Sequence, residues 1–150
     1  MNDFSHLDPQ GHARMVDVSA KPPSAREAVA RGEIHLQPST LAAIEKNEVA
    51  KGNVFATARV AGIMAAKKTG DLVPLCHPLN ITHCAVEFDI PAAQDRVVIT
   101  ATTRIIAATG VEMEALTAVT VAALTIYDMC KAADKTMRIT DITLVSKRKH

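Results

Sequence analysis

The spacing of apolar residues changes along the chain from alternation to helical repeats. Residues 82–90 and 96–106 alternate between apolar and polar side chains, which predicts two strands. Apolar and small residues recur at helical spacing over residues 54–69 and 111–131, which predicts two longer helices. A last alternating run at residues 137–146 predicts a final strand. The order predicted for the second half is therefore strand, strand, helix, strand, after an earlier helix.

The first third of the chain gives shorter signals. Residues 14–19 alternate well enough to predict a short strand. Residues 24–32 begin with a Ser-x-x-Glu capping box and end in glycine, which predicts a helix. Residues 33–37 predict a short strand, and Pro38 opens a second short helix that extends to about residue 47.

Gly62 lies in the middle of the helix predicted over residues 54–69, which is otherwise rich in alanine. A glycine inside a helix costs about 1 kcal/mol relative to alanine. We therefore expect Gly62 to mark a close contact with another helix or with backbone. Pro74 and Pro78 interrupt the segment that follows, which predicts an irregular loop over residues 72–78.

This order of elements fits a ferredoxin-like α+β fold, in which an antiparallel sheet has its helices packed on one face. The 150 residues correspond to a single domain, 1–150, with residues 1–12 and 147–150 expected to be mobile. Apolar residues make up 48% of the chain but aromatic residues only 3%, so aliphatic side chains, alanine and methionine must build the core. So many small residues favour close helix packing and are compatible with self-association.

Charge and cysteine content exclude several classes of protein. The net charge of +1 argues against a nucleic-acid binder that neutralises many phosphates, although a local cluster of lysine and arginine could hold one triphosphate. The three cysteines show no paired spacing typical of disulfides. No apolar run at the N-terminus predicts a signal peptide, and the nearly uncharged stretch 115–127 is too short to span a bilayer. We expect a cytoplasmic protein with neither a membrane nor a nucleic-acid partner.

The first candidate for chemistry is a Cys-His pair flanked by two prolines. The rigid loop would point His77 at a phosphate or purine, or let it move a proton, while a purely structural histidine is the alternative. Cys76, His77, His83 and Cys84 together also allow a zinc site. Adjacent Cys76 and His77 are awkward co-ligands, however, and there is no C-x-x-C pair. We therefore expect no metal.

The second candidate is the long helix over residues 111–131, which has carboxylates at both ends. Asp128 and Lys131 lie about 60° apart on one face, where they can relay protons or form an ordinary ion pair. Glu112 and Glu114 lie in the first turn, where the helix dipole alone would favour them. Glu114 and Asp128 are about 21 Å apart along the axis, so one straight helix cannot bring both to one small substrate. If both serve one site, two subunits must contribute to it.

Further basic residues are scattered along the chain. A triphosphate needs several converging cations, and spacing alone does not show that these converge. Without any comparison, the residues indicate only an α+β domain that could act on an anion. The scattered cations are Lys51, Lys67, Lys68, Arg104 and Lys147.

Several long blocks of the chain, taken in order, are specific enough to identify a family. Together they resemble the cyclic pyranopterin monophosphate synthases, the molybdenum-cofactor accessory protein C family, from about Gly11 to Lys147. The blocks are MVDVS at 15–19, KG at 51–52, ATAR at 56–59, LCHPL at 75–79, TGVEMEALT at 109–117 and AALTIYDMCKA at 122–132.

The resemblance implies a fold, an assembly and a reaction. Members of this family are ferredoxin-like homohexamers, built as trimers of dimers with active sites at the dimer interface. They are lyases that convert 3',8-cyclo-7,8-dihydroguanosine 5'-triphosphate to cyclic pyranopterin monophosphate and release pyrophosphate, an early step of molybdenum cofactor (molybdopterin) biosynthesis. The resemblance implies no cofactor and no metal.

The resemblance also implies roles for individual residues. By matching motifs, Asp128, Lys131 and Lys51 are the expected catalytic residues. The expected substrate-binding residues are Leu75, Cys76, His77, Met113, Glu114, Glu112, Asp17 and Lys147.

Two departures from the family pattern bear on substrate binding. Ala108 stands where most relatives have lysine or arginine, and Arg104 is a possible substitute. The sequence ends Ser-Lys-Arg-Lys-His where relatives carry a glycine-rich basic tail. A non-catalytic binding protein of the same fold is therefore the alternative function.

Overall fold

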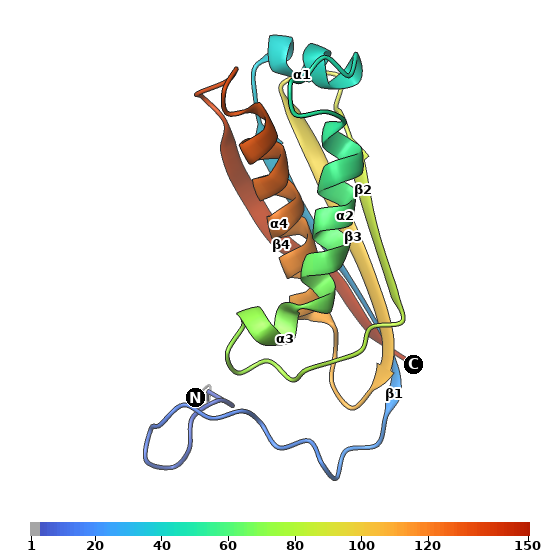
Figure 1. The fold of residues 1–150 in the computed structure, drawn as a ribbon. Helices are drawn as coiled ribbons and strands as arrows, with labels where there is room; N and C mark the ends of the chain where they lie inside the picture. Colours follow the sequence, from blue (N-terminus) through green and yellow to red (C-terminus); the bar gives the residue numbers. More distant parts are fainter. Residues whose placement is uncertain (1–3) are drawn as a thin grey trace.

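A computed structural model describes residues 4–150 as a four-stranded sheet with helices on one face (Figure 1). The strand order is β2-β3-β1-β4, and every neighbouring pair is antiparallel. This arrangement confirms the predicted ferredoxin-like α+β fold. The elements are β1 Ser24–His35, α1 Pro38–Glu45, α2 Val54–Lys67, α3 Thr69–Leu72, β2 His83–Asp89, β3 Arg96–Ala107, α4 Glu112–Cys130 and β4 Arg138–Lys149.

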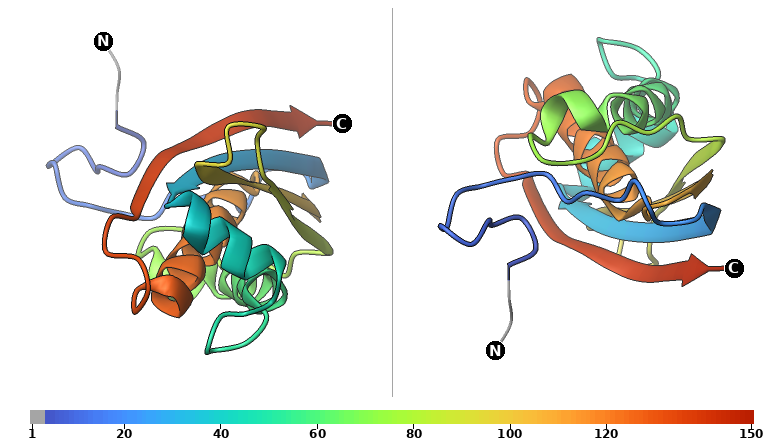
Figure 2. Two further views of the ribbon diagram at one scale, coloured as in Figure 1. Left: turned by 90° about the horizontal axis from the view of Figure 1, so that it is seen from above. Right: turned by 90° about the horizontal axis from the view of Figure 1, so that it is seen from below.

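The core lies between the sheet and helices α2 and α4. Both helices run along the same face of the sheet, with α1 at one end of this layer and α3 at the other (Figures 1 and 2). Alternate residues of the two central strands face the helices and are buried, among them Ala30 and Ile34 of β1 and Ile99 of β3. By length and composition α4 could cross a membrane, but half of its apolar stretch is buried inside the domain. The same composition is found in helices that pack in a protein core.

Gly62 lies at a close contact between α2 and α4. A Cβ atom at this position would lie 3.0 Å from the backbone oxygen of Ala118 and 3.2 Å from Cγ2 of Val86. The contact predicted from the sequence is therefore confirmed. It lets α2 pack tightly against both α4 and strand β2.

Replacing Gly62 by leucine is expected to destabilise the fold by about 2 kcal/mol or more, because a larger side chain must push α2 away from α4. Urea unfolding monitored by circular dichroism would measure the change. Val60→Leu, at an exposed position of the same helix, is the matched control and should unfold like the parent. Equal midpoints for the two variants would show that the helix contact tolerates bulk.

The predicted helix at residues 24–32 is wrong, because β1 is one continuous strand from Ser24 to His35. The capping box is a local signal worth about 1 kcal/mol. It is outweighed because β1 pairs along its length with both β3 and β4. The sequence also contained the competing signal, since Ala28, Ala30, Gly32 and Ile34 alternate with larger or charged residues.

The strand predicted at residues 14–19 is wrong as well. This part of the chain is irregular (Figure 2). Within it, Asp17 closes a turn by accepting hydrogen bonds from the backbone and hydroxyl of Ser19. At the other end, β4 continues through Lys149 and pairs with β1. Residues 147–149 therefore form a paired strand, in contrast to the mobile tail that we expected.

Asp134 is a buried carboxylate in the connection between α4 and β4. It accepts hydrogen bonds from the backbone of Gln37 at 2.9 Å, from the Thr40 hydroxyl at 2.9 Å, and from the backbone and hydroxyl of Thr136 at 2.8 and 2.7 Å. Burial raises its pKa, but these hydrogen bonds together outweigh burial and lower the pKa to about 2. The hydrogen bonds of Asp134 thus connect the start of α1 to the segment after α4.

The lowered pKa of Asp134 predicts a loss of stability in acid. An unfolded aspartate titrates near 3.8, so the folded carboxylate contributes about 2 kcal/mol at neutral pH. That contribution is present above pH 4 and is lost as the pH falls through the folded pKa near 2. Urea unfolding at pH 7 and pH 3 should therefore show the stability difference between the parent and Asp134→Asn shrinking in acid. A difference that is constant with pH would contradict the assignment.

Candidate active site

The predicted site residues form two groups, one at each end of α4. Seven of them line a cavity at the N-terminal end of the helix, and three form an ion-pair cluster at the C-terminal end. The seven are Leu75, Cys76, His77, Glu112, Met113, Glu114 and Lys147.

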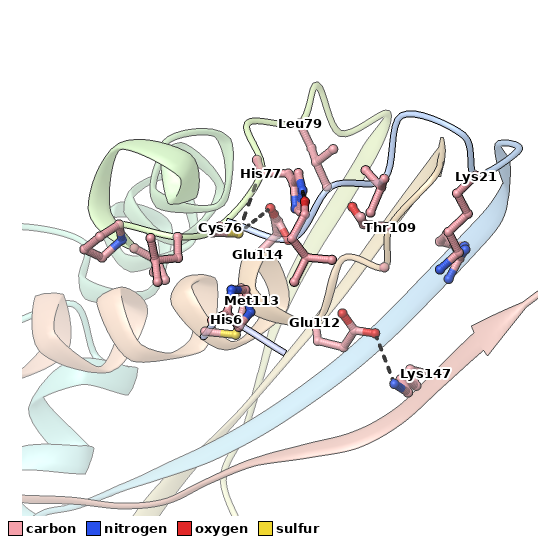
Figure 3. A pocket seen from close by; sticks show the side chains of 17 residues that line it. His6, Lys21, Cys76, His77, Leu79, Thr109, Glu112, Met113, Glu114 and Lys147 are labelled. Carbon is pink, nitrogen blue, oxygen red and sulfur yellow. Dashed lines mark hydrogen bonds and ion pairs between the residues drawn. The ribbon is translucent and has the colours of Figure 1, made fainter. Parts of the chain in front are cut away.

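The cavity has a volume of about 690 Å³. Its walls come from the proline-rich loop after α3, the first turn of α4, the end of β4 and the N-terminal segment (Figure 3). The loop follows the surface irregularly, as its prolines predict. The volume suits a molecule of nucleotide size.

A buried carboxyl group lies in the wall of this cavity. Glu114 is only 2% exposed, and its Oε2 accepts a weak hydrogen bond from Sγ of Cys76 at 3.9 Å. Its Oε1 atom has no hydrogen-bond partner among residues 4–150. Burial raises the pKa of Glu114, and the nearby charge of Glu112 raises it further. Burial together with Glu114 also raises the pKa of the Cys76 thiol. A carboxyl with a raised pKa can both donate and accept hydrogen bonds, which suits recognition of a heterocyclic ring.

His77 connects the loop to the N-terminal segment. Its Nε2 atom lies 2.6 Å from the backbone oxygen of Val16, within hydrogen-bonding distance. Val16 and Val18 line the cavity, but Asp17 between them does not, so the expected role of Asp17 in binding stays a prediction.

Two cations in the cavity wall were not predicted from the sequence. Lys21 comes from the N-terminal segment and Arg26 from β1, and Figure 3 shows Lys21 on the same side as Lys147. Lys147 lies 3.7 Å from Glu112. Arg26 donates a hydrogen bond to the backbone oxygen of Ala108, so its guanidinium lies beside that position. Arg104, which the sequence offered as a possible substitute, instead pairs with Glu27 at 2.7 Å and does not line the cavity.

The second group is a carboxylate held between two lysines. One oxygen of Asp128 lies 2.9 Å from Nζ of Lys131, and the other lies 3.0 Å from Nζ of Lys51. Hydrogen bonds from Lys131 and then Lys51 lower the pKa of Asp128, and the same carboxylate raises the pKa of Lys131. All three side chains are about half exposed, so a substrate can reach them. A charged acid–base group open to solvent is suited to proton transfer.

The remaining candidates are not brought together. Lys67 and Lys68 do not line the cavity, and neither does His83. Among residues 4–150, the group of potential metal ligands whose donor atoms converge within 4.8 Å is Glu33, His35 and Asp141, not the Cys-His set considered above.

Comparisons with known proteins place the chain in a family. The MoaC family model matches residues 15–150. The chain is 59% identical to the cyclic pyranopterin monophosphate synthase of Roseiflexus castenholzii, covering 98% of this chain and 93% of that protein. It is 60% identical to the protein of the same name from Chloroflexus aurantiacus, with 98% and 90% covered. It is 59% identical to cyclic pyranopterin monophosphate synthase 3 of Mycobacterium tuberculosis, with 98% and 85% covered. On these matches the chain belongs to the MoaC family.

Proposed function

We propose that this chain is a cyclic pyranopterin monophosphate synthase, a lyase of molybdenum cofactor biosynthesis. Its substrate would be 3',8-cyclo-7,8-dihydroguanosine 5'-triphosphate, and its products cyclic pyranopterin monophosphate and pyrophosphate. The observation that carries the proposal is the pair of complementary groups at the two ends of α4, in a chain about 60% identical to proteins of that name.

The cavity supplies the binding chemistry in this proposal. Lys21, Arg26 and Lys147 would hold the phosphates, because lysine and arginine are the usual partners of phosphate oxygens. Glu114 would hydrogen-bond the polar edge of the purine-derived ring through its unpartnered Oε1 atom. Leu75 and Met113 would pack against the ring. A site built in this way selects for the ring at one end and the triphosphate at the other.

The Asp128 cluster supplies proton transfer. Its carboxylate is ionised at neutral pH and can accept a proton, while the ammonium groups of Lys131 and Lys51 can donate one. Such transfers are needed to open the five-membered ring of the purine and to close the pterin. A ribose-derived hydroxyl then attacks the phosphorus nearest the sugar, and pyrophosphate leaves. No cofactor or metal is required for these steps.

Because the two groups lie at opposite ends of α4, one subunit cannot bring both to one substrate. The helix rises about 1.5 Å per residue, which separates Glu114 from Asp128 by about 21 Å. We therefore propose that the cavity of one subunit faces the Asp128 cluster of another, in a homohexamer built as a trimer of dimers. The exposed lysines of the cluster are compatible with a position at such an interface. We also propose that the enzyme acts in the cytoplasm.

The proposal is tested by incubating the purified chain with freshly made cyclic substrate. Pyrophosphate and the oxidised pterin should appear in equal amounts. Substrate binding without either product would overturn the catalytic function and indicate a binding relative. Inductively coupled plasma mass spectrometry on the same sample would show whether a metal accompanies the activity.

A milder effect is expected at Lys21. Lys21→Gln should raise KM on the order of tenfold and change kcat less, because one of several phosphate contacts is lost. Steady-state kinetics at low salt would measure both constants. The matched control is Lys68→Gln, which removes an exposed lysine that does not line the cavity. An equal KM for the two variants would place Lys21 outside the phosphate site.

A further inference from the structure

The Asp128 cluster joins two segments that are far apart in the chain. Asp128 and Lys131 belong to the end of α4, whereas Lys51 belongs to the loop that connects α1 with α2. The distance between Nζ of Lys51 and the Asp128 carboxylate therefore depends on how α1 is placed against α4. We propose that Asp134 is a positioning residue that sets this placement, an inference that rests on the proposed function.

Asp134 is bonded to both segments at once. Its backbone N–H donates to the oxygen of Cys130 at 3.0 Å, which fixes it directly after α4. Its side chain reaches the first turn of α1, where it accepts from the backbone N–H of Gln37 and the hydroxyl of Thr40. The residue is 2% exposed, so these hydrogen bonds are shielded from water. A single side chain thus connects the two elements from which the cluster is assembled.

Packing between these elements is otherwise incomplete. A cavity of about 390 Å³ lies between the last turn of α4 and the segment from α1 to residue 50. Its walls include Thr40, Ala43 and Val49 on one side and Met129 and Cys130 on the other. The Asp134 hydrogen bonds and the Lys51–Asp128 ion pair both bridge these two sides. When the first bridge is removed, the exposed ion pair alone cannot hold the geometry, because such pairs contribute little free energy.

Asp134 does not act by touching the reacting groups. Its hydrogen-bond donors are neutral backbone and hydroxyl groups, and among residues 4–150 it forms no ion pair with the lysines of the cluster. Its influence passes through the backbone of α1 to the loop that holds Lys51. A displacement of about 1 Å at a catalytic group can cost about 10²-fold in rate, so even a small shift of α1 would be measurable.

The first test is kinetic. Asp134→Asn should lower kcat about tenfold in the assembled enzyme, with KM changed by less than about threefold, because the phosphate-binding cavity lies at the other end of α4. Thr69→Val is the matched control, since it removes a buried side-chain hydrogen bond at the start of α3, outside α1 and α4. A kcat equal to that of Thr69→Val, at equal stability, would overturn the proposal.

The second test does not depend on turnover. It uses nuclear magnetic resonance of lysines that carry ¹³C-methyl groups, which keep their charge. The signal of Lys51 is identified because it is lost in Lys51→Arg. Because Nζ of Lys51 contacts the Asp128 carboxylate, Asp128→Asn should shift the ¹³C resonance of the Lys51 methyl groups in the parent but should shift it much less in the Asp134→Asn background. An equal change in both backgrounds would overturn the positioning role. If the effect of Asp128→Asn on the Lys51 signal depends on Asp134 while the parent shows no turnover, the positioning role stands and the proposed function fails.

Discussion

Replacing Asp128 by asparagine is expected to lower kcat by about 10³-fold while leaving the fold and the assembly intact. The amide keeps the size of the side chain but cannot accept a proton or neutralise Lys51 and Lys131. The carboxylate is 54% exposed, and surface ion pairs contribute little to stability, so the loss should be confined to chemistry.

This result would be measured as pyrophosphate release under saturating substrate, together with the molecular mass in solution. Asp89→Asn is the matched control, because it removes an exposed carboxylate of β2 that neither lines the cavity nor pairs with Lys51 or Lys131. If Asp128→Asn retained activity within a few-fold of the parent, Asp128 would have no part in proton transfer. A loss of the assembled form would instead show that the ion pair is structural.

Mixing two inactive variants is expected to restore activity if each site combines groups from two subunits. Asp128→Asn damages one end of α4, and Glu114→Gln damages the cavity at the other, where it should cost about 10²-fold or more because a buried hydrogen-bonding group is mismatched. In a mixed dimer, one site receives both damaged groups and the other receives two intact ones. Random assembly in equal amounts should therefore restore about a quarter of the parent activity.

The variants would be unfolded together, refolded, and compared with the same proteins refolded separately and then combined. Activity should appear only in the first sample, because subunits must exchange for intact sites to form. As an internal control, Asp128→Asn mixed with Lys131→Ala should stay inactive, since both changes affect the same end of α4. Failure of Asp128→Asn and Glu114→Gln to restore activity, although mixed oligomers form, would contradict a shared site.

The second half of the fold could be predicted because its periodic signals are long. The alternation in β2 and β3 and the helical repeat in α4 agree with their burial in the structure. The error at β1 arose because a capping box is read from neighbouring residues, whereas the pairing of β1 is made with strands from the second half of the chain. Local chemistry therefore predicted a helix where non-local hydrogen bonds form a strand.

In the candidate site, too, local motifs could be predicted from the sequence, whereas residues brought in by the fold could not. The motif matches gave both ends of α4, and helix geometry alone predicted that they are too far apart for one site. Lys21 and Arg26 were missed because no pattern in their own surroundings marks them as binding residues. They reach the cavity through the path of the N-terminal segment and the position of β1 in the sheet. One signal could have pointed to Arg26. A strand predicted over β1 would have placed Arg26 beside β4, where it pairs with Lys149.

The sheet topology also bears on how the chain folds during synthesis. The central strand β1 leaves the ribosome early, but its two neighbours, β3 and β4, follow much later in the chain. The apolar face of β1 therefore lacks its packing partner α4, and its two edges stay unpaired, until β3, α4 and β4 have been made. Such late pairing slows folding and exposes strand edges to association. Nascent chains of this protein should thus depend on chaperones, and slowing translation should not speed formation of the native sheet.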